Sequence, residues 1–510
     1  MVSATLAQAV IPAKAAELDK TTRSAVNLLR SSMSARKDRQ HLDMVRALRQ
    51  LDDPELQPFF SKLVDGDDQI LRGHGLLGLA ECSPEKRIDT LRLTMFEIPT
   101  LQRRVISFAM DEDLLGQDQA EQLMNSHGLD PTVRAVAASF LLMNGKIPDA
   151  DFLRESMSSD NIALVGLSAM LLLQLGDDTV LAQLKQLGRL QTAVEQTDQR
   201  ATQRRARSQG QLRDRVRAQL LRTAFQSEFH RVASWAMLIS VEDEADAVLQ
   251  RLALLVALRF GAPEAVDVWR KQFKSASQRV VRVKIAMVAL NAAHWLEPHN
   301  FNLLIGSDDR MLHLIGKAAV AVASGKNIVG SVLKAIELNN EQINNWAMDY
   351  AVKLASDKDA QAIFLGLILA FEGDQLGKAQ RLSHAIDATT AMSNEHPDAA
   401  RVLLRPLLVE ANTDRQLVRG ILIGLIKSDV LDSYPIIDGL TPFKDTRAAN
   451  LALLITAKHG HNLTDHQLHD LALLVRGGGK LQRHFRIQAA WAYLKQTGKT
   501  RLALAEALGP

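Results

Sequence analysis

The chain has 510 residues, of which 47% are hydrophobic and 23% are charged. This balance is ordinary for a folded protein and excludes global disorder, and the length favours several domains or a repeat array over one compact core. The net charge of +3 gives no global reason to bind nucleic acid, and the single cysteine, Cys82, excludes an intrachain disulfide and a thiolate metal cluster.

Few residues in the chain disfavour helix. Aromatic residues make up 5% of the sequence, and there are 14 prolines and 28 glycines, so helix is expected almost everywhere. No stretch approaches the roughly 20 consecutive apolar residues that a membrane span needs. Residues 1–16 are expected to form a flexible N-terminus. The tripeptide at residues 7–9 is similar to a signal-peptidase site but lacks a basic region before it, so we expect a cytoplasmic protein, with an exported form as the alternative.

A helix-start pattern recurs at positions 68, 99, 130 and 160, which are 31, 31 and 30 residues apart. Aspartate stands at three of these positions, and an aspartate before a helix accepts hydrogen bonds from the first free amides. Pro131 occupies a first helical position, where its missing N–H has no cost. A second helix is expected to follow each start, beginning for example near Asp149 and Asp177, so each repeat holds two helices.

The run Asp130-Pro131-x-Val133-Arg134-x-x-Ala137 resembles the second-helix signature of HEAT repeats, particularly the short bacterial HEAT-like type. The resemblance is clearest over residues 68–190. It implies that aspartates and arginines of successive repeats form a polar ladder through the stack, which would break at Leu164, where the family has arginine. The residues that the resemblance assigns to this ladder are Asp68, Arg72, Arg103, Asp130, Arg134 and Asp160.

The C-terminal half carries looser copies of the pattern. Asp309, Asp414 and Asp445 each precede an apolar helical segment, and the last two are 31 residues apart. No alternating strand pattern occurs. We therefore predict an all-α fold, a curved α-solenoid of stacked HEAT-like helical hairpins in two halves joined by an arginine-rich segment. The predicted segments are an N-terminal solenoid at 17–192, a connecting segment at 193–222 and a C-terminal solenoid at 223–510.

The connecting segment is strongly basic. Between positions 200 and 222 there are eight arginines and one acid, a local net charge of 8 − 1 = +7. The arginines are Arg200, Arg204, Arg205, Arg207, Arg213, Arg215, Arg217 and Arg222. Arginine pairs well with phosphate or carboxylate, so the segment is a candidate anion-binding site. Like-charge blocks are more often solvated connectors, and that interpretation is favoured.

Other candidate sites are weak. The histidines between 459 and 469 lack a metal-protease signature and are expected to lie at a surface turn, and Gly477-Gly478-Gly479-Lys480 lacks the strand and the Ser or Thr of a phosphate loop. Cys82 is expected to be a buried, inert thiol. The five tryptophans are expected to pack between helices, and any on an inner face would be binding anchors. No catalytic residue, metal or cofactor is predicted.

Two classes of function follow from the pattern. A repeat array exposes much surface, which favours a non-enzymatic scaffold that docks protein partners of unknown identity. The alternative is a nucleic-acid-binding protein that uses the arginine-rich segment. Some HEAT-like proteins resemble DNA glycosylases, and others resemble phycobilin lyases or chaperones for a cofactor protein, but no residue of this chain matches their sites. The oligomeric state stays open.

Overall fold

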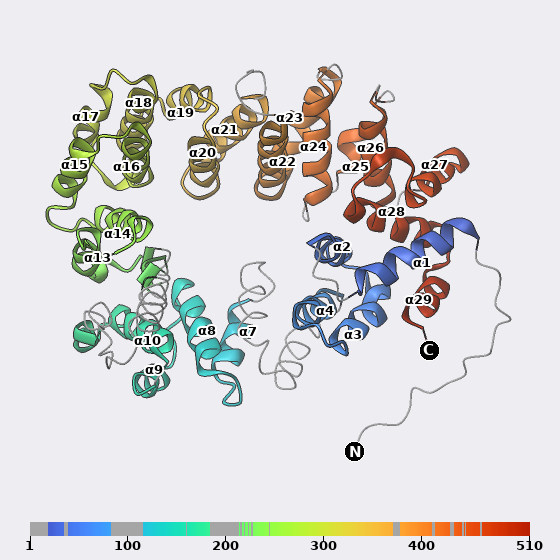
Figure 1. Cartoon of the computed structure of the whole chain (residues 1–510), viewed down its shortest axis with the longest axis horizontal. Coiled ribbons are helices and arrows are strands. Elements are labelled where there is room, and N and C mark those ends of the chain that lie inside the picture. The colour runs from blue at the N-terminus through green and yellow to red at the C-terminus, as the bar shows by residue number, and fades with distance from the viewer. Residues whose placement is uncertain are drawn as a thin grey trace, which may run out of the picture. The chain divides into compact units, whose positions relative to one another are not determined.

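The described part of the chain is built from helices (Figure 1). It comes from a computed structural model and covers residues 19–34, 39–82, 116–159, 161–183, 214, 217–218, 220–222, 224–225, 228–243, 245–370, 378–410, 414–428, 433–440, 443, 445–458 and 462–509. Within these ranges no strand occurs, which confirms the predicted all-α class.

The chain divides into two compact units. One contains residues 1–87 together with 401–510, and the other contains residues 88–400. Both ends of the chain therefore belong to the same unit, a grouping that the sequence analysis did not anticipate. The segment boundaries expected at 192 and 222 lie inside the second unit, and most residues between them lie outside the described ranges.

The helices of the first unit are α1 (Lys20–Ser32), α2 (Arg39–Arg49), η1 (Pro54–Leu56), α3 (Gln57–Val64), α4 (Gln69–Cys82), α23 (Pro397–Glu410, which crosses the boundary), α24 (Arg415–Lys427), α25 (Tyr434–Ile437), α26 (Thr446–Lys458), α27 (Asp465–Val475), η10 (Gly478–Lys480), α28 (Arg483–Gln496) and α29 (Thr500–Leu508).

The helices of the second unit are α7 (Gln117–Met124), α8 (Pro131–Met143), α9 (Ala150–Ser156), α10 (Ile162–Gln174), η4 (Asp178–Val180), η5 (His230–Val232), α13 (Ala233–Ser240), α14 (Ala247–Arg259), α15 (Ala265–Ser275), α16 (Arg279–Asn291), η6 (Ala293–Trp295), η7 (Pro298–Phe301), α17 (Asn302–Ile305), α18 (Arg310–Ser324), α19 (Ile328–Ile336), α20 (Glu341–Lys353), α21 (Asp357–Leu369) and α22 (Lys378–Glu395).

Helices adjacent in the chain pack as hairpins, among them α3 with α4, α7 with α8, α13 with α14 and α27 with α28. The expected caps at Asp68 and Asp130 are present, but the helix that each starts packs on the helix before it and is the second of its hairpin, not the first as expected. The Asp68 carboxylate accepts hydrogen bonds from the amides of Ile70 and Leu71, at 2.8 and 3.0 Å, and Asp130 accepts one from Thr132 at 2.7 Å. These contacts satisfy amides that have no partner within the helix.

Some of the other predicted helix starts are confirmed and others are not. Asp309 and Asp414 cap α18 and α24 as expected, and Asp445 accepts a hydrogen bond from the amide of Ala448 in α26. Helix α10 begins one residue later than predicted, because Asn161 accepts a hydrogen bond from the Leu164 amide at 3.4 Å. Asp160 and the start expected at 99 lie outside the described residues.

A second polar contact recurs inside the hairpins. The donor is the fourth residue of the second helix, and it binds a backbone carbonyl at or just after the end of the first helix. The pairs are Arg72 with Val64 (3.0 Å), Arg134 with Met124 (2.6 Å), Gln250 with Glu242 (2.7 Å), Arg282 with Ala276 (2.7 Å), His313 with Ile305 (2.7 Å) and Arg486 with Val475 (2.9 Å). Helix C-termini leave carbonyls without intrahelical partners, so these side chains hold the two helices of a hairpin together.

Second helices of successive hairpins also contact one another, as in α8 with α10, α14 with α16, α16 with α18, and α24 with α26. Charged and polar groups at their N-termini reinforce these contacts. Arg279 of α16 pairs with Asp309, and Arg419 of α24 pairs with Asp445 at 2.5 and 2.7 Å. The Arg279 guanidinium holds the pKa of Asp309 below its usual range. One carboxylate thus caps its own helix and binds the preceding hairpin.

The two ends of the chain pack together within the first unit. Helix α1 contacts α28 and α29, and α2 contacts α28. In Figure 1 the blue N-terminal helices lie against the red C-terminal helices. The apolar part of this packing is complete, because Met44, Leu48 and Leu494 are 0% exposed. Each end thus covers apolar surface of the other.

Hydrogen bonds and ion pairs also join the two ends of the chain. Trp491 Nε1 donates a hydrogen bond to Asp53 Oδ2 at 2.9 Å, and Lys495 Nζ lies 2.9 Å from the same oxygen. Burial alone would raise the pKa of Asp53, but these two donors outweigh it and hold the pKa below its usual range. Lys499 pairs with Asp19 at 2.7 Å in the same way.

We predict that Asp53→Asn destabilises the first unit by about 1–3 kcal/mol at pH 7, since a charge-assisted acceptor of two donors is lost. The depressed pKa means that the carboxylate stabilises the folded state above about pH 4, the range of an unfolded aspartate, and that this contribution is lost as the pH falls below it. Urea unfolding of both proteins between pH 3 and 7, followed by hydrogen exchange of α2 and α28, checks this. A difference that is constant with pH would contradict it.

A second prediction concerns the hairpin contacts. Arg134 donates to the Met124 carbonyl and its guanidinium lies 3.8 Å from the centre of the Phe152 ring. We expect Arg134→Met to lower the free energy of unfolding by about 1–3 kcal/mol. The matched control is Arg154→Met, whose side chain is 57% exposed and should change stability by less than about 0.5 kcal/mol. Hydrogen exchange of α7 and α8 measures both, and equal protection in both variants would count against the contact.

Candidate functional site

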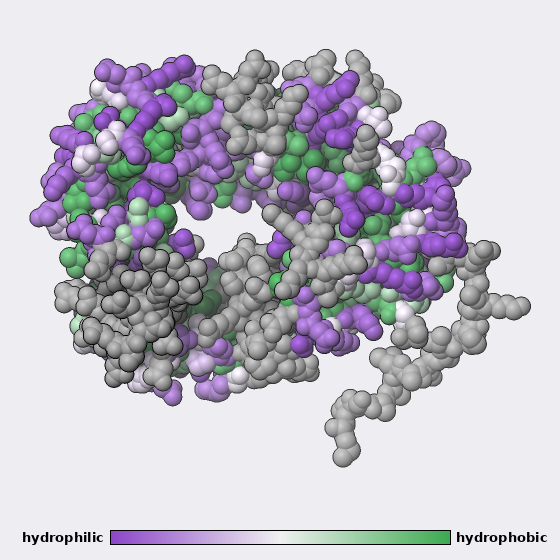
Figure 2. All heavy atoms as spheres, viewed as in Figure 1, coloured by the Kyte–Doolittle hydropathy of each residue, from purple (hydrophilic) through white to green (hydrophobic). Residues whose placement is uncertain are grey.

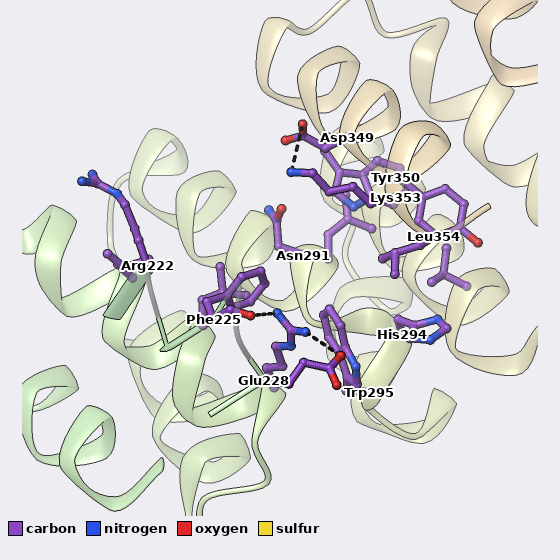
Figure 3. A pocket seen from close by; sticks show the side chains of 16 residues that line it. Arg222, Phe225, Glu228, Asn291, His294, Trp295, Asp349, Tyr350, Lys353 and Leu354 are labelled. Atoms are coloured by element: carbon purple, nitrogen blue, oxygen red, sulfur yellow. Dashed lines mark hydrogen bonds and ion pairs between the residues drawn. The ribbon is translucent and has the colours of Figure 1, made fainter. Parts of the chain in front are cut away.

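A cavity of about 510 Å³ lies within the second unit, inside the range of roughly 300–1,000 Å³ typical of ligand pockets. Its walls come from Arg222, Phe225 and Glu228 and from four second helices, α14, α16, α18 and α20, with η6 following α16. Three of these helices, α14, α16 and α18, are held in their hairpins by the side-chain-to-carbonyl contacts described above. Figure 3 shows their side chains around a common space.

Arg259, at the end of α14, organises one wall of the cavity. Its guanidinium carbon lies 4.1 Å from the centre of the Phe225 ring and 4.4 Å from that of Trp295, and the two rings meet edge to face with their centres 5.9 Å apart. It also donates hydrogen bonds to the Phe225 carbonyl and, at 3.3 Å, to the Glu228 carboxylate. Figure 3 shows Phe225, Glu228 and Trp295 meeting at this point.

The environment of Arg259 leaves it charged but little hydrated. Its side chain is 10% exposed. Burial lowers the pKa of Arg259 from its ordinary value, and the Glu228 carboxylate opposes this change. An arginine with so high a starting pKa remains protonated at neutral pH. The residue therefore fixes the geometry of two aromatic rings rather than acting as a free cation.

The opposite wall is apolar and aromatic. Trp346 and Tyr350 of α20 stack with their ring centres 5.7 Å apart, and each is 5% exposed. Burial, with a smaller contribution from Asp359, raises the pKa of Tyr350, so its phenol is neutral at physiological pH. Leucines complete the lining, namely Leu252, Leu255, Leu290 and Leu354.

Charged groups at the edge of the cavity are mostly paired. Glu228 pairs with Arg259, and Asp349 pairs with Lys353 at 3.8 Å on the same face of α20. Arg222 is exposed, and it forms no ion pair with any residue that the structure describes. Its side chain points outward from the cavity edge (Figure 3). His294 is also exposed and packs edge-on against Trp295.

The chemistry of the lining supports binding. Among the described residues that line the cavity there is no serine, threonine or cysteine. The one phenol is neutral, and each carboxylate is engaged by a cation. Aromatic rings with a fixed arginine and exposed leucine are the composition of a binding anchor site.

The predicted arginine-rich site is only partly described. Arg217 is 2% exposed and pairs with Glu242 at 2.9 Å and with Asp214 at 3.7 Å, so its charge is compensated inside the fold. Arg222 lies at the edge of the cavity. The other six lie outside the described residues: Arg200, Arg204, Arg205, Arg207, Arg213 and Arg215.

The residues assigned to a polar ladder have contacts within their own hairpins. Asp68 and Asp130 cap helices, and Arg72 and Arg134 bind the end of the preceding helix. Arg103 and Asp160 lie outside the described residues, so a continuous ladder stays a prediction. Polar links between successive hairpins occur at other residues, such as Asn161, whose side-chain amide donates to Thr132 at 3.2 Å.

Sequence reasoning missed Arg259 and the cavity itself. It singled out the tryptophans as anchors should they share an inner face, and Trp295 and Trp346 both line the cavity, whereas Trp235, Trp269 and Trp491 are buried elsewhere. The sequence shows that Arg259, followed by Phe260, ends an apolar helical segment. Nothing in the sequence places this arginine beside Phe225 and Trp295.

Other polar clusters are structural. Arg49, Glu81 and His74 are buried together between α2 and α4, with Arg49 Nε 2.9 Å from Glu81 Oε2 and Arg49 Nη1 3.1 Å from His74 Nδ1. Cys82 is buried as expected, and burial, with nearby acids, raises the pKa of its thiol to about 12. Among the described residues no group of three or more histidine, cysteine or acidic side chains could hold a metal ion.

Comparison with protein-family models, curated proteins and solved structures found no match to this chain. Over the described ranges, no helix has the length and apolar character required to cross a bilayer. Hydrophilic residues cover much of the described surface in Figure 2, with hydrophobic residues visible in the spaces between helices. The site must therefore be interpreted from its own geometry.

We predict that Arg259→Ala loosens the aromatic wall and lowers the free energy of unfolding of the second unit by about 1–3 kcal/mol, because two rings lose a packed cation and a hydrogen-bond donor. Arg251→Ala, on the same helix and outside the lining, is the control. Near-ultraviolet circular dichroism and thermal unfolding measure the effect. Identical aromatic spectra for the wild type and Arg259→Ala would show that Arg259 does not organise the wall.

Proposed function

We propose that this protein is a non-enzymatic, HEAT-like helical-repeat scaffold that binds a protein partner on the surface of its second helices. The observation that carries the proposal is the cavity between residues 222 and 354, where Trp295, the fixed Arg259 and exposed Leu354 come together. Aromatic residues and arginine dominate the binding energy of protein interfaces, and such anchors lie in well-packed pockets.

The repeat organisation supports the same function. Polar links between neighbouring hairpins connect residues about one repeat apart, as Arg279 with Asp309 and Asn161 with Thr132 do. An arrangement in which each repeat contacts its neighbours is that of a solenoid, whose extended surface suits partner binding. The alternative of nucleic-acid binding has less support, because Arg217 is buried in ion pairs and the cavity edge carries acids as well as bases.

The test compares two leucine-to-glutamate variants. Leu354 lines the cavity and is 39% exposed, whereas Leu238 lies on α13, outside the lining, and is 55% exposed. A partner bound in the cavity should be recovered from native lysate at least about tenfold less by Leu354→Glu, since a charge would have to be desolvated, and unchanged by Leu238→Glu. Quantitative affinity capture with mass spectrometry measures this.

Two outcomes would contradict the proposed function. Recovery of the same partners by both variants would place binding away from the cavity. Failure of the wild-type protein to recover any stoichiometric partner would contradict the scaffold itself. Circular dichroism of each variant checks that the helices are intact, and both positions are exposed enough for glutamate to be accommodated.

A further inference from the structure

The cavity has a shape and exposure that suit a segment of polypeptide. Its lining residues come from successive elements along the chain, from Arg222 to Leu354, so the site extends across several repeats. Exposed side chains at its edge, including Arg222, His294 and Lys353, leave it open to solvent. A compact ligand would be enclosed by such a site only in part, whereas an elongated segment could insert one side chain and lie across the rest.

The depth of the cavity favours an apolar anchor. Leu252, Leu255 and Leu290 face it together with Val322, and the Trp346 and Tyr350 rings form its opposite side. The acids and bases closest to these walls compensate one another, so no unpaired charge of the described lining lies deep in the cavity. A leucine or aromatic side chain would replace water against these walls without leaving a charge unsatisfied.

The charge of Arg222 at the cavity edge determines which residue can flank that anchor in the partner. Glu228 and Asp349 are each occupied by a cation, whereas Arg222 carries a charge that no described acid compensates. His294, on the other side of the cavity from Arg222 (Figure 3), is exposed and can donate a separate hydrogen bond to an oxygen. The complement of this edge is a carboxylate, because arginine binds carboxylates through two parallel hydrogen bonds.

We propose that the cavity binds a partner segment in which a leucine or aromatic anchor is flanked by aspartate or glutamate, with the carboxylate on Arg222 and the anchor between Trp295 and Trp346. This inference rests on the proposed function and specifies the partner for the same site. In this proposal Arg222 determines specificity and the apolar walls supply affinity, so specificity and affinity can be altered separately.

The experiment uses the full chain as bait for a phage-displayed library of random peptides. Sequences that combine an apolar anchor with adjacent acids should be enriched on the wild-type protein. Leu354→Glu should abolish the enrichment. Arg222→Glu should instead shift the preference from acidic to basic flanks, with at least about a tenfold loss of affinity for the original acidic peptides by fluorescence anisotropy. Lys326→Glu, an equal change of charge at an exposed residue outside the lining, should leave both unchanged.

The outcomes separate the two proposals. Enrichment of apolar peptides that depends on Leu354 but shows no acidic preference, or that survives Arg222→Glu unchanged, would overturn the acidic-segment inference and keep the protein-binding function. Equal effects of Arg222→Glu and Lys326→Glu would show that only the net charge of the protein matters. That result would also overturn the acidic-segment inference. Absence of any peptide that depends on Leu354, together with capture from lysate that does not depend on it, would overturn both.

Discussion

The structure depends on one constraint: a single amphipathic helix of this chain cannot bury its apolar face alone. Each helix packs on its partner in a hairpin, and the second helix packs again on that of the next hairpin, as α14 does on α16 and α16 on α18. Because most packing is between neighbours, the position of each helix depends on a few local contacts. The side-chain-to-carbonyl hydrogen bonds at Arg134 and Arg282 are such contacts, fixing the second helix against the end of the first.

The same constraint applies at the two ends of the chain, where α1 and α2 pack on α28 and α29 within the first unit. Trp491 and Lys495 converge on Asp53, so the contact has polar specificity as well as apolar area. At the cavity, second helices present leucine and aromatic side chains to a common space, which is where we propose that a partner binds.

Local features were predictable from the sequence and distant ones were not. Asp130, Pro131 and the apolar spacing after them specify α8, because capping and periodicity act within a few residues. The start predicted at 160 is one residue early, since Asn161 accepts the hydrogen bond from the Leu164 amide. The cavity joins Phe225, Trp295 and Trp346, and the terminal packing joins Ala47 to Gln488. No local pattern encodes which of many similar helical faces meet across such separations.

Site-specific photocrosslinking tests most directly whether a partner protein occupies the cavity. Benzoylphenylalanine placed at position 354 reports on the cavity, and the same group at position 238 reports on an exposed surface outside it. The account predicts a discrete protein adduct at 354, mapped to one segment of one partner, and none of that partner at 238. The same adduct at both positions, or no protein adduct at 354 while the folded chain retains its helices, would contradict it.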